Sequence, residues 1–294
     1  MTIAQIKTLI PENAQAKGRM AALTGGILLS FDPIFVRLSS VGGYETAFLF
    51  GLFSALSMFS LIQVTDERGL VKTMKESGWP AVLSGLIILG SASMFVLSIK
   101  HTTVANTMMI LSGRPVLTAA AAWIFLKERT TGKLWLAIGG VICGMAVVVS
   151  GSLRSGNIHG DLLALLGVTC LALNGALWRH FKAMSRLLVV GLGGLFMAVV
   201  MAGPANLSAI PARTWLVMAC MGLLSAPLGR VLNAVSSRYI PAAEMATYAL
   251  ISPVLAPLWV FALFREQPPA ATALGGTIIM GAIAAYIAAT RKRS

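Results

Sequence analysis

The chain has 294 residues, of which 57% are hydrophobic and only 11% are charged, and its formal net charge is +13. A soluble domain carries about 25% charged residues because its surface faces water, so this composition excludes a water-soluble globular fold. The basic excess could also suggest a nucleic-acid-binding protein, but the basic residues lie in short segments between long apolar runs, where they report membrane orientation instead. We therefore expect a membrane protein with no nucleic-acid partner.

Ten apolar runs predict an all-α, polytopic membrane protein, since a helix needs about 20 mostly apolar residues to cross a bilayer. In chain order the predicted spans are 20–38, 44–64, 80–99, 103–126, 134–151, 161–181, 187–204, 213–233, 242–264 and 270–290. These spans use most of the chain, so no soluble domain is expected. The lipid bilayer is the partner that this pattern requires.

The segments outside the spans are short and polar. Residues 1–18 form a predicted cytoplasmic arm whose apolar residues have helical spacing, so the arm could lie on the membrane surface or be disordered. The longest predicted loop is 66–78, and 291–294 form a basic tail. No small-x-small cleavage site follows the first apolar run, which is therefore expected to be a retained span and not a cleaved signal peptide.

The lysines and arginines predict the orientation of the spans. With the N-terminus in the cytoplasm, 16 of the 23 basic residues fall on the cytoplasmic side and 5 on the opposite side. The remaining two, Arg114 and Arg230, lie within spans. Because cytoplasmic segments are enriched in basic residues, this bias predicts that both termini are cytoplasmic and that the number of spans is even.

Cysteines and histidines give no sign of a metal or redox site. The three cysteines lie inside apolar runs, at Cys143, Cys170 and Cys220. The three histidines lie in separate loops or helix ends, at His101, His159 and His180. Neither set has the spacing of metal ligands, so we expect no metal and no cofactor.

An internal repeat divides the chain into two halves, expected to be five-helix units at 19–151 and 161–290. A shift of 138 residues aligns 98–128 with 236–266, so that Pro-Val-Leu at 115–117 faces Pro-Val-Leu at 253–255. Lys127-Glu128 then faces Arg265-Glu266, and a glycine-rich span follows each copy. Because five is odd, the second half is expected to enter the membrane from the opposite side, which is typical of secondary transporters with a substrate site near the midplane. Duplication of a scaffold without transport is the alternative.

The proline-to-glutamate unit at Pro115–Glu128 and Pro253–Glu266, each followed by a glycine-rich span, resembles the drug/metabolite transporter superfamily. More narrowly, nearly all of residues 20–290 are similar to its ten-helix EamA-type members, and most similar to bacterial amino-acid exporters of the YddG type. The resemblance implies a helix basket around a central cavity with spans 134–151 and 270–290 at the periphery. It also implies export of small metabolites, often amino acids, across the inner membrane. Gln267-Pro268-Pro269 departs from the repeat, where the first copy keeps Arg129.

Charged residues deep within spans are the main candidates for substrate binding, because they are costly in a membrane and usually face a cavity or one another. Asp32 is the only acidic residue well inside a span, and Arg114 and Arg230 are the internal basic residues. Asp32 and Arg114 could hold the ammonium and carboxylate groups of an amino acid. They could equally form a structural pair, and Arg230 could extend to the cytoplasmic interface.

Three further residues are candidate ligand contacts. Asn174 occupies the repeat position of Asp32, at a shift of 142, and Trp178 follows it by one helical turn. Tyr248 lies midway along span 242–264. Each could instead be a packing residue. We also expect Pro115 and Pro253, at matched repeat positions, to act as hinges, since a proline inside a helix removes a hydrogen bond and bends the helix.

Other functions make different demands on the sequence. A rhomboid-like intramembrane protease would need Gly-x-Ser-Gly and a histidine within a span, which this sequence lacks, and a channel would need rings of like charge along a pore. Within transporters, the alternative substrate is a lipophilic cation or toxic compound, which would require Asp32 to be free of arginine. Coupling to protons and passive facilitation both remain open, and a homodimer through spans 134–151 and 270–290 is a further prediction.

Overall fold

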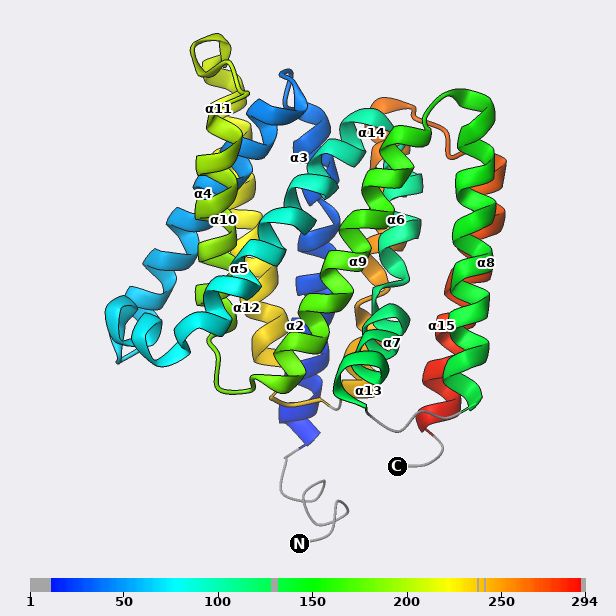
Figure 1. Ribbon diagram of the computed structural model, residues 1–294, viewed down its shortest axis with the longest axis horizontal. Coiled ribbons are helices and arrows are strands. Elements are labelled where there is room, and N and C mark those ends of the chain that lie inside the picture. The colour runs from blue at the N-terminus through cyan, green and yellow to red at the C-terminus, as the bar shows by residue number, and fades with distance from the viewer. Residues whose placement is uncertain (1–11, 128–131, 237, 241, 292–294) are drawn as a thin grey trace, which may run out of the picture.

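The computed structural model describes residues 12–127, 132–236, 238–240 and 242–291, and this part of the chain is helical without β-strands. The helices are α2 (Glu12–Ser30), α3 (Asp32–Leu38), α4 (Gly43–Thr65), α5 (Gly69–His101), α6 (Val104–Ser112), α7 (Arg114–Leu126), α8 (Gly132–Ser155), α9 (Ile158–His180), α10 (Arg186–Ala202), α11 (Ala212–Ala219), α12 (Ala226–Ser236), α13 (Ala242–Tyr248), α14 (Ile251–Phe264) and α15 (Ala270–Arg291). A π-helical turn, Cys220–Ser225, joins α11 to α12. Figure 1 shows one bundle in which α2 begins and α15 ends at the same end.

The length and composition of the helices identify a multi-pass membrane protein. Seven continuous or gently bent helical segments in the described residues are long and apolar enough to cross a bilayer, and eight if the bent pair α6–α7 is one span. Large apolar side chains are exposed on the bundle, among them Leu136, Phe125 and Leu166, as expected for a surface that faces lipid. Each predicted span falls on one helix or on consecutive helices, but α10 and α14 are too short for this test. The finer count of ten spans is therefore not established by helix length.

Four predicted spans are interrupted immediately before a proline. A break at Phe31 precedes Pro33 in α3, and a break at Gly113, where the chain bends by 41°, precedes Pro115 in α7. Another break, after α13, precedes Pro253 in α14, and the π-helical turn precedes Pro227 in α12. Pro33, Pro115 and Pro253 lie in the first turn of the helix that follows the break, where the backbone N–H has no intrahelical acceptor and its absence costs nothing. Pro227 instead lies in a helix that continues from α11 through the π-helical turn. The bend at Gly113 agrees with the kink expected at Pro115.

Two predicted polar segments are more ordered than expected. The stretch 66–78 is not a loop, because α5 begins at Gly69 and turns at Gly78, whose φ of 58° favours glycine. Arg68 bridges Asp66 and Glu76, each at 2.8 Å, and its hydrogen bonds lower the pKa of Asp66 to about 2. The end of the predicted arm belongs to α2, which begins at Glu12, whereas residues 1–11 lie outside the described residues.

Helix packing follows a small set of close pairs: α4 with α10, α8 with α15, α5 with α9, and α2 with α12. Glycines permit two of these contacts, since a Cβ at Gly51 would lie 2.6 Å from the carbonyl oxygen of Gly194, and one at Gly144 would lie 2.7 Å from that of Gly275. In Figure 1, α8 and α15 lie side by side at one edge of the bundle, which agrees with the peripheral place expected for them.

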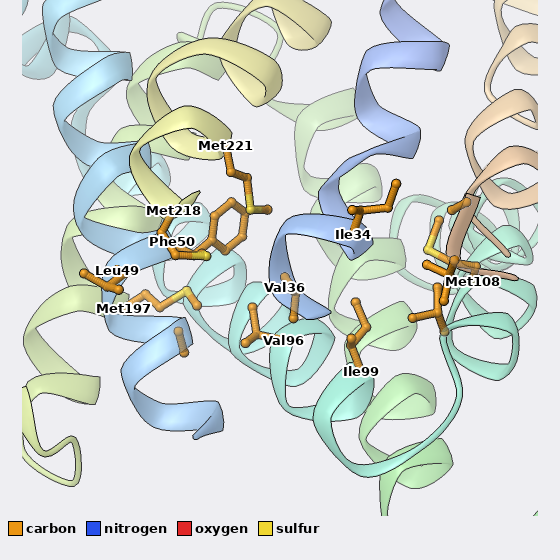
Figure 2. Close-up of a cluster of buried hydrophobic side chains, with 14 of the residues drawn as sticks. Ile34, Val36, Leu49, Phe50, Val96, Ile99, Met108, Met197, Met218 and Met221 are labelled. Carbon is orange, nitrogen blue, oxygen red and sulfur yellow. The ribbon is translucent and has the colours of Figure 1, made fainter. Parts of the chain in front are cut away.

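The largest buried apolar cluster joins both halves of the chain (Figure 2). Its labelled side chains come from α3, α4, α5, α6, α10 and the α11–π-turn segment, and are Ile34, Val36, Leu49, Phe50, Val96, Ile99, Met108, Met197, Met218 and Met221. A cluster that spans both halves holds the break of the first span, and therefore Asp32, at a fixed place in the bundle.

Candidate functional site

Asp32 and Arg230 are brought together near the break in the first span. Asp32 begins α3 and its side chain is buried, whereas Arg230 lies on α12 with its guanidinium 5.9 Å from the ring centre of Phe50. The two charges interact electrostatically, but no ion pair of 4.0 Å or shorter joins them. Asp32 Oδ1 and Arg230 Nη1 are each buried without a hydrogen-bond partner.

This arrangement leaves one acceptor and one donor available inside the bundle. An unpaired buried polar group costs about 1–3 kcal/mol, and more when it is charged. The cost is offset if a third molecule carries both an ammonium and a carboxylate group. A zwitterion placed between the two side chains would supply both missing partners.

Two stacked aromatic rings lie at the break that precedes Asp32. Phe31, which directly precedes Asp32, stacks on Trp259 of α14 with 5.6 Å between ring centres. Trp259 donates its Nε1–H to Ser30 Oγ at 3.0 Å, so the break between α2 and α3 is held against α14. Phe50 brings an aromatic ring to the Arg230 side of the charged pair, and such an apolar surface would suit the side chain of an amphipathic ligand.

Asn174 and Trp178 belong to a second polar cluster. Ser84 of α5 donates to Asn174 Oδ1 and accepts the Nε1–H of Trp178 at 2.8 Å. The side-chain nitrogen of Asn174 is buried and has no partner. The guanidinium of Arg186 lies 5.5 Å from the ring centre of Trp178. Sequence reasoning missed Ser84 because a serine within an apolar span carries no distinctive signal.

Arg114 is not the partner of Asp32 in this structure. It begins α7 immediately after the break at Gly113, and the charge that acts on it is that of Arg186, which is also positive. The charge that interacts with Asp32 is that of Arg230, so the structure does not show the structural pair of Asp32 with Arg114, and a role of Arg114 in ligand binding stays a prediction. Helix-level prediction could not identify the interaction of Asp32 with Arg230, because it depends on how α3 and α12 pack.

The other predicted residues lie at helix breaks. Tyr248 is the last residue of α13 and is partly buried, and a Cβ at Gly26 of α2 would lie 3.4 Å from its carbonyl oxygen. Pro115 and Pro253 lie in the first turns of α7 and α14. These positions place the three residues next to backbone that can change direction; whether they bind substrate or act as hinges stays a prediction.

The repeated Lys/Arg–Glu pair ends both of the equivalent helices. Lys127 and Arg265, the C-caps of α7 and α14, have the same left-handed backbone, with φ of 52° and 56°. Glu266 forms an ion pair with Arg37 at 3.0 Å and accepts the N–H of Val104 at 2.7 Å, so it joins α14, α3 and α6. Glu128 lies outside the described residues.

Comparison with known proteins identifies the family. The model of the EamA-like transporter family matches the chain twice, over residues 16–150 and 158–288. The chain is 28% identical over 234 residues to "Uncharacterized transporter YyaM" of Bacillus subtilis (strain 168), a match that covers 74% of this chain and 76% of that protein. A crystal structure described only as that of a "protein" has the same fold, with a TM-score of 0.62, 16% identity, and coverage of 95% and 99% of the two chains. The chain belongs to the EamA-like transporter family.

Proposed function

We infer that this secondary transporter exports small zwitterionic metabolites, in particular amino acids, across the bacterial inner membrane by alternating access. The observation that carries this proposal is the pair formed by Asp32 and Arg230. Their charges are opposite, their distance exceeds that of an ion pair, and each has a buried atom without a hydrogen-bond partner. Asp32 would bind the ammonium group of the substrate, and Arg230 would bind its carboxylate.

Ten spans in two inverted repeats are part of the same proposal. The packing of the helices supports it. The third span of the first half, α5, packs on the first span of the second half, α9, and the third span of the second half, α12, packs on the first span of the first half, α2. Exchanging the two halves therefore converts one helix pair into the other. The glycine contacts agree, since a Cβ at Gly25 would lie 2.9 Å from Gly229 O and one at Gly167 would lie 3.6 Å from Ser91 O, at matching repeat positions. In Figure 1 the helices α7 and α14 end at opposite ends of the bundle. Halves related in this way can exchange conformations and so expose one site to either side.

The orientation is proposed from the basic residues. The predicted topology puts 16 of the 23 lysines and arginines on the side of the membrane where the first span begins, and we assign this side to the cytoplasm. The pair α8–α15, packed together at one edge, is the proposed contact of a homodimer.

A lipophilic cation is the second candidate substrate. Asp32 Oδ1 has no hydrogen-bond partner, and an unpaired buried acceptor of this kind could bind a cation. The unfilled Arg230 Nη1 favours the zwitterion, because a positively charged ligand would be repelled by this arginine.

Counterflow in proteoliposomes tests the proposal. Vesicles loaded with one unlabelled amino acid are diluted into the same labelled compound, for a panel that includes lipophilic cations and matched amino-acid amides. We expect accumulation of at least one amino acid, and none of its amide, because the amide lacks the carboxylate. Accumulation of cations alone would assign the site to the second candidate, and accumulation of neither class would refute both.

A further inference from the structure

At the end of the bundle where α9 begins, Gly160 and Asp161 lie against the turn between α5 and α6. A Cβ at Gly160 would lie 2.5 Å from Thr102 Cβ and 2.6 Å from its backbone nitrogen, so no other residue fits without movement. Asp161, which is fully buried, accepts from Thr102 Oγ1 at 2.7 Å and from Asn106 Nδ2 at 3.0 and 3.2 Å. Asn106 also donates to Ser152 and accepts from Thr272. The start of α9 is therefore held tightly against the turn between α5 and α6.

At the opposite end, Gly18 and Arg19 of α2 lie against the turn before α13. A Cβ at Gly18 would lie 2.6 Å from Tyr239 Cβ and 3.2 Å from Ile240 Cγ2. Arg19 Nε donates to Glu244 Oε1 at 2.7 Å. This ion pair is partly exposed, with 51% of the arginine side chain and 16% of the glutamate side chain accessible.

The two contacts occupy equivalent positions in the two halves. A shift of 142 residues carries Gly18 and Arg19 onto Gly160 and Asp161. The residues that they contact are related by the repeat shift of 138, which aligns 101–106 with 239–244 and therefore Asn106 with Glu244. The same shift relates two neighbouring hydrogen bonds, Ser98 with Thr107 and Ser236 with Met245.

We propose that these contacts are two latches which close opposite ends of the transport pathway. Both are formed in this structure, and each opens in a different half of the transport cycle. The cytoplasmic latch is Gly18–Arg19 with Tyr239, Ile240 and Glu244. The outer latch is Gly160–Asp161 with Thr102 and Asn106. Each joins the first span of one half to the fourth span of the other, so opening one end requires these two spans to separate there.

The latches use different chemistry at the same geometry. The outer latch is a buried carboxylate held by neutral donors, whereas the cytoplasmic latch is a partly exposed ion pair. An exposed pair contributes less than a buried hydrogen-bonded network. The cytoplasmic latch is therefore the weaker one, and the conformation that opens to the cytoplasm is the easier to reach from this structure.

Hydrogen–deuterium exchange of the full-length protein in lipid nanodiscs tests the latches without any substrate. The measured quantities are the exchange rates of the first-turn amides of α13 and of α6. Arg19→Gln should speed exchange in α13 and slow it in α6, with a change in the opening equilibrium of about two- to fivefold. Asp161→Asn should do the reverse, by roughly tenfold. A charge-reversed double variant, Arg19→Glu with Glu244→Arg, should return both helices to the parent rates.

The reciprocal change separates a latch from a local structural contact. A contact that only stabilises its own end would speed exchange there and leave the far end unchanged, and that result, or no change at either end, would overturn the proposal. Glu244→Gln removes the partner of Arg19, and Asn106→Leu removes a donor to Asp161. These variants replace Arg19→Gln and Asp161→Asn if either of those does not fold. Arg68→Gln, which breaks an exposed ion pair at the cytoplasmic end, is the matched control and should affect neither helix. The latches rest on the proposed alternating access. Because hydrogen–deuterium exchange is measured without a ligand, a negative amino-acid counterflow result would not affect this test of the latches.

Discussion

Replacing Asp32 by asparagine should weaken substrate binding while leaving the shape of the site unchanged. The substitution removes the charge that would hold the substrate ammonium, and a hydrogen bond to a charged group is worth about 1.5–3 kcal/mol. The expected increase in Kd is therefore about 10- to 150-fold. Arg230→Gln should raise Kd by a similar factor, because it removes the donor to the substrate carboxylate. Neither effect should be recovered in the double variant.

A purely structural role of the pair predicts a different pattern. Removing one partner of a buried pair leaves the other charge uncompensated, at a cost of roughly 3–5 kcal/mol in soluble proteins. Poor yield of folded protein in both single variants, recovery in the double variant and near-normal affinity would then be observed. Equilibrium binding of a labelled amino acid and thermal unfolding of the same samples distinguish the cases, with Glu67→Gln, an exposed carboxylate between α4 and α5, as the control. Single variants that fold, bind and transport like the parent would refute both roles.

Three further predictions concern the architecture. Single cysteines at the C-terminal ends of α7 and α14, in a background without native cysteines, should react with an impermeant maleimide from opposite sides of the membrane, and labelling from the same side would contradict the inverted repeat. Pro115→Ala and Pro253→Ala should slow counterflow without reducing membrane insertion, whereas unchanged rates in both and in the double variant would mean that these prolines only start helices. Gly51→Ala should destabilise the α4–α10 contact by about 1–3 kcal/mol in thermal unfolding, because its Cβ would lie 2.6 Å from a backbone oxygen, whereas Gly139→Ala, with nothing within 4 Å, should be close to neutral.

The positions of the helices could be predicted from the sequence because a bilayer demands long apolar runs and leaves charges only in the connections. The same rule explains the misassigned segment 66–78. Its charged residues excluded it from a span, but a helix such as the first part of α5 needs no apolar run when it lies outside the membrane. Only Gly78, where the backbone turns, marked the boundary that the structure shows.

Partners across helices could not be predicted in the same way. Hydropathy locates Asp32, Arg114 and Arg230 along their helices but says nothing about helix rotation or packing, so the sequence alone favours Asp32 with Arg114 over Asp32 with Arg230. The interruption at Phe31 and the π-helical turn before α12 together decide where Asp32 and Arg230 lie. Asp161 was overlooked for a related reason: a charge at a span end is ordinary, and its burial depends on Gly160, whose close approach to Thr102 is visible only in three dimensions.

Charged side chains near the ends of this bundle have ion-pair or hydrogen-bond partners, whereas Asp32 and Arg230, inside their spans, form no ion pair. This difference is the strongest physical argument for a ligand between Asp32 and Arg230. Near the ends, Arg37 is paired with Glu266 although its Nε has no hydrogen-bond partner, Arg19 is paired with Glu244, and Asp161 with neutral donors. Within the first and eighth predicted spans, Asp32 and Arg230 keep unfilled atoms although each interacts with the other's charge. A protein selected only for stability would shorten this distance or replace both residues by apolar ones, since a buried pair is often no better than a hydrophobic contact. A transporter needs two opposite charges that are held apart, because the substrate must bind transiently to both of them and then be released.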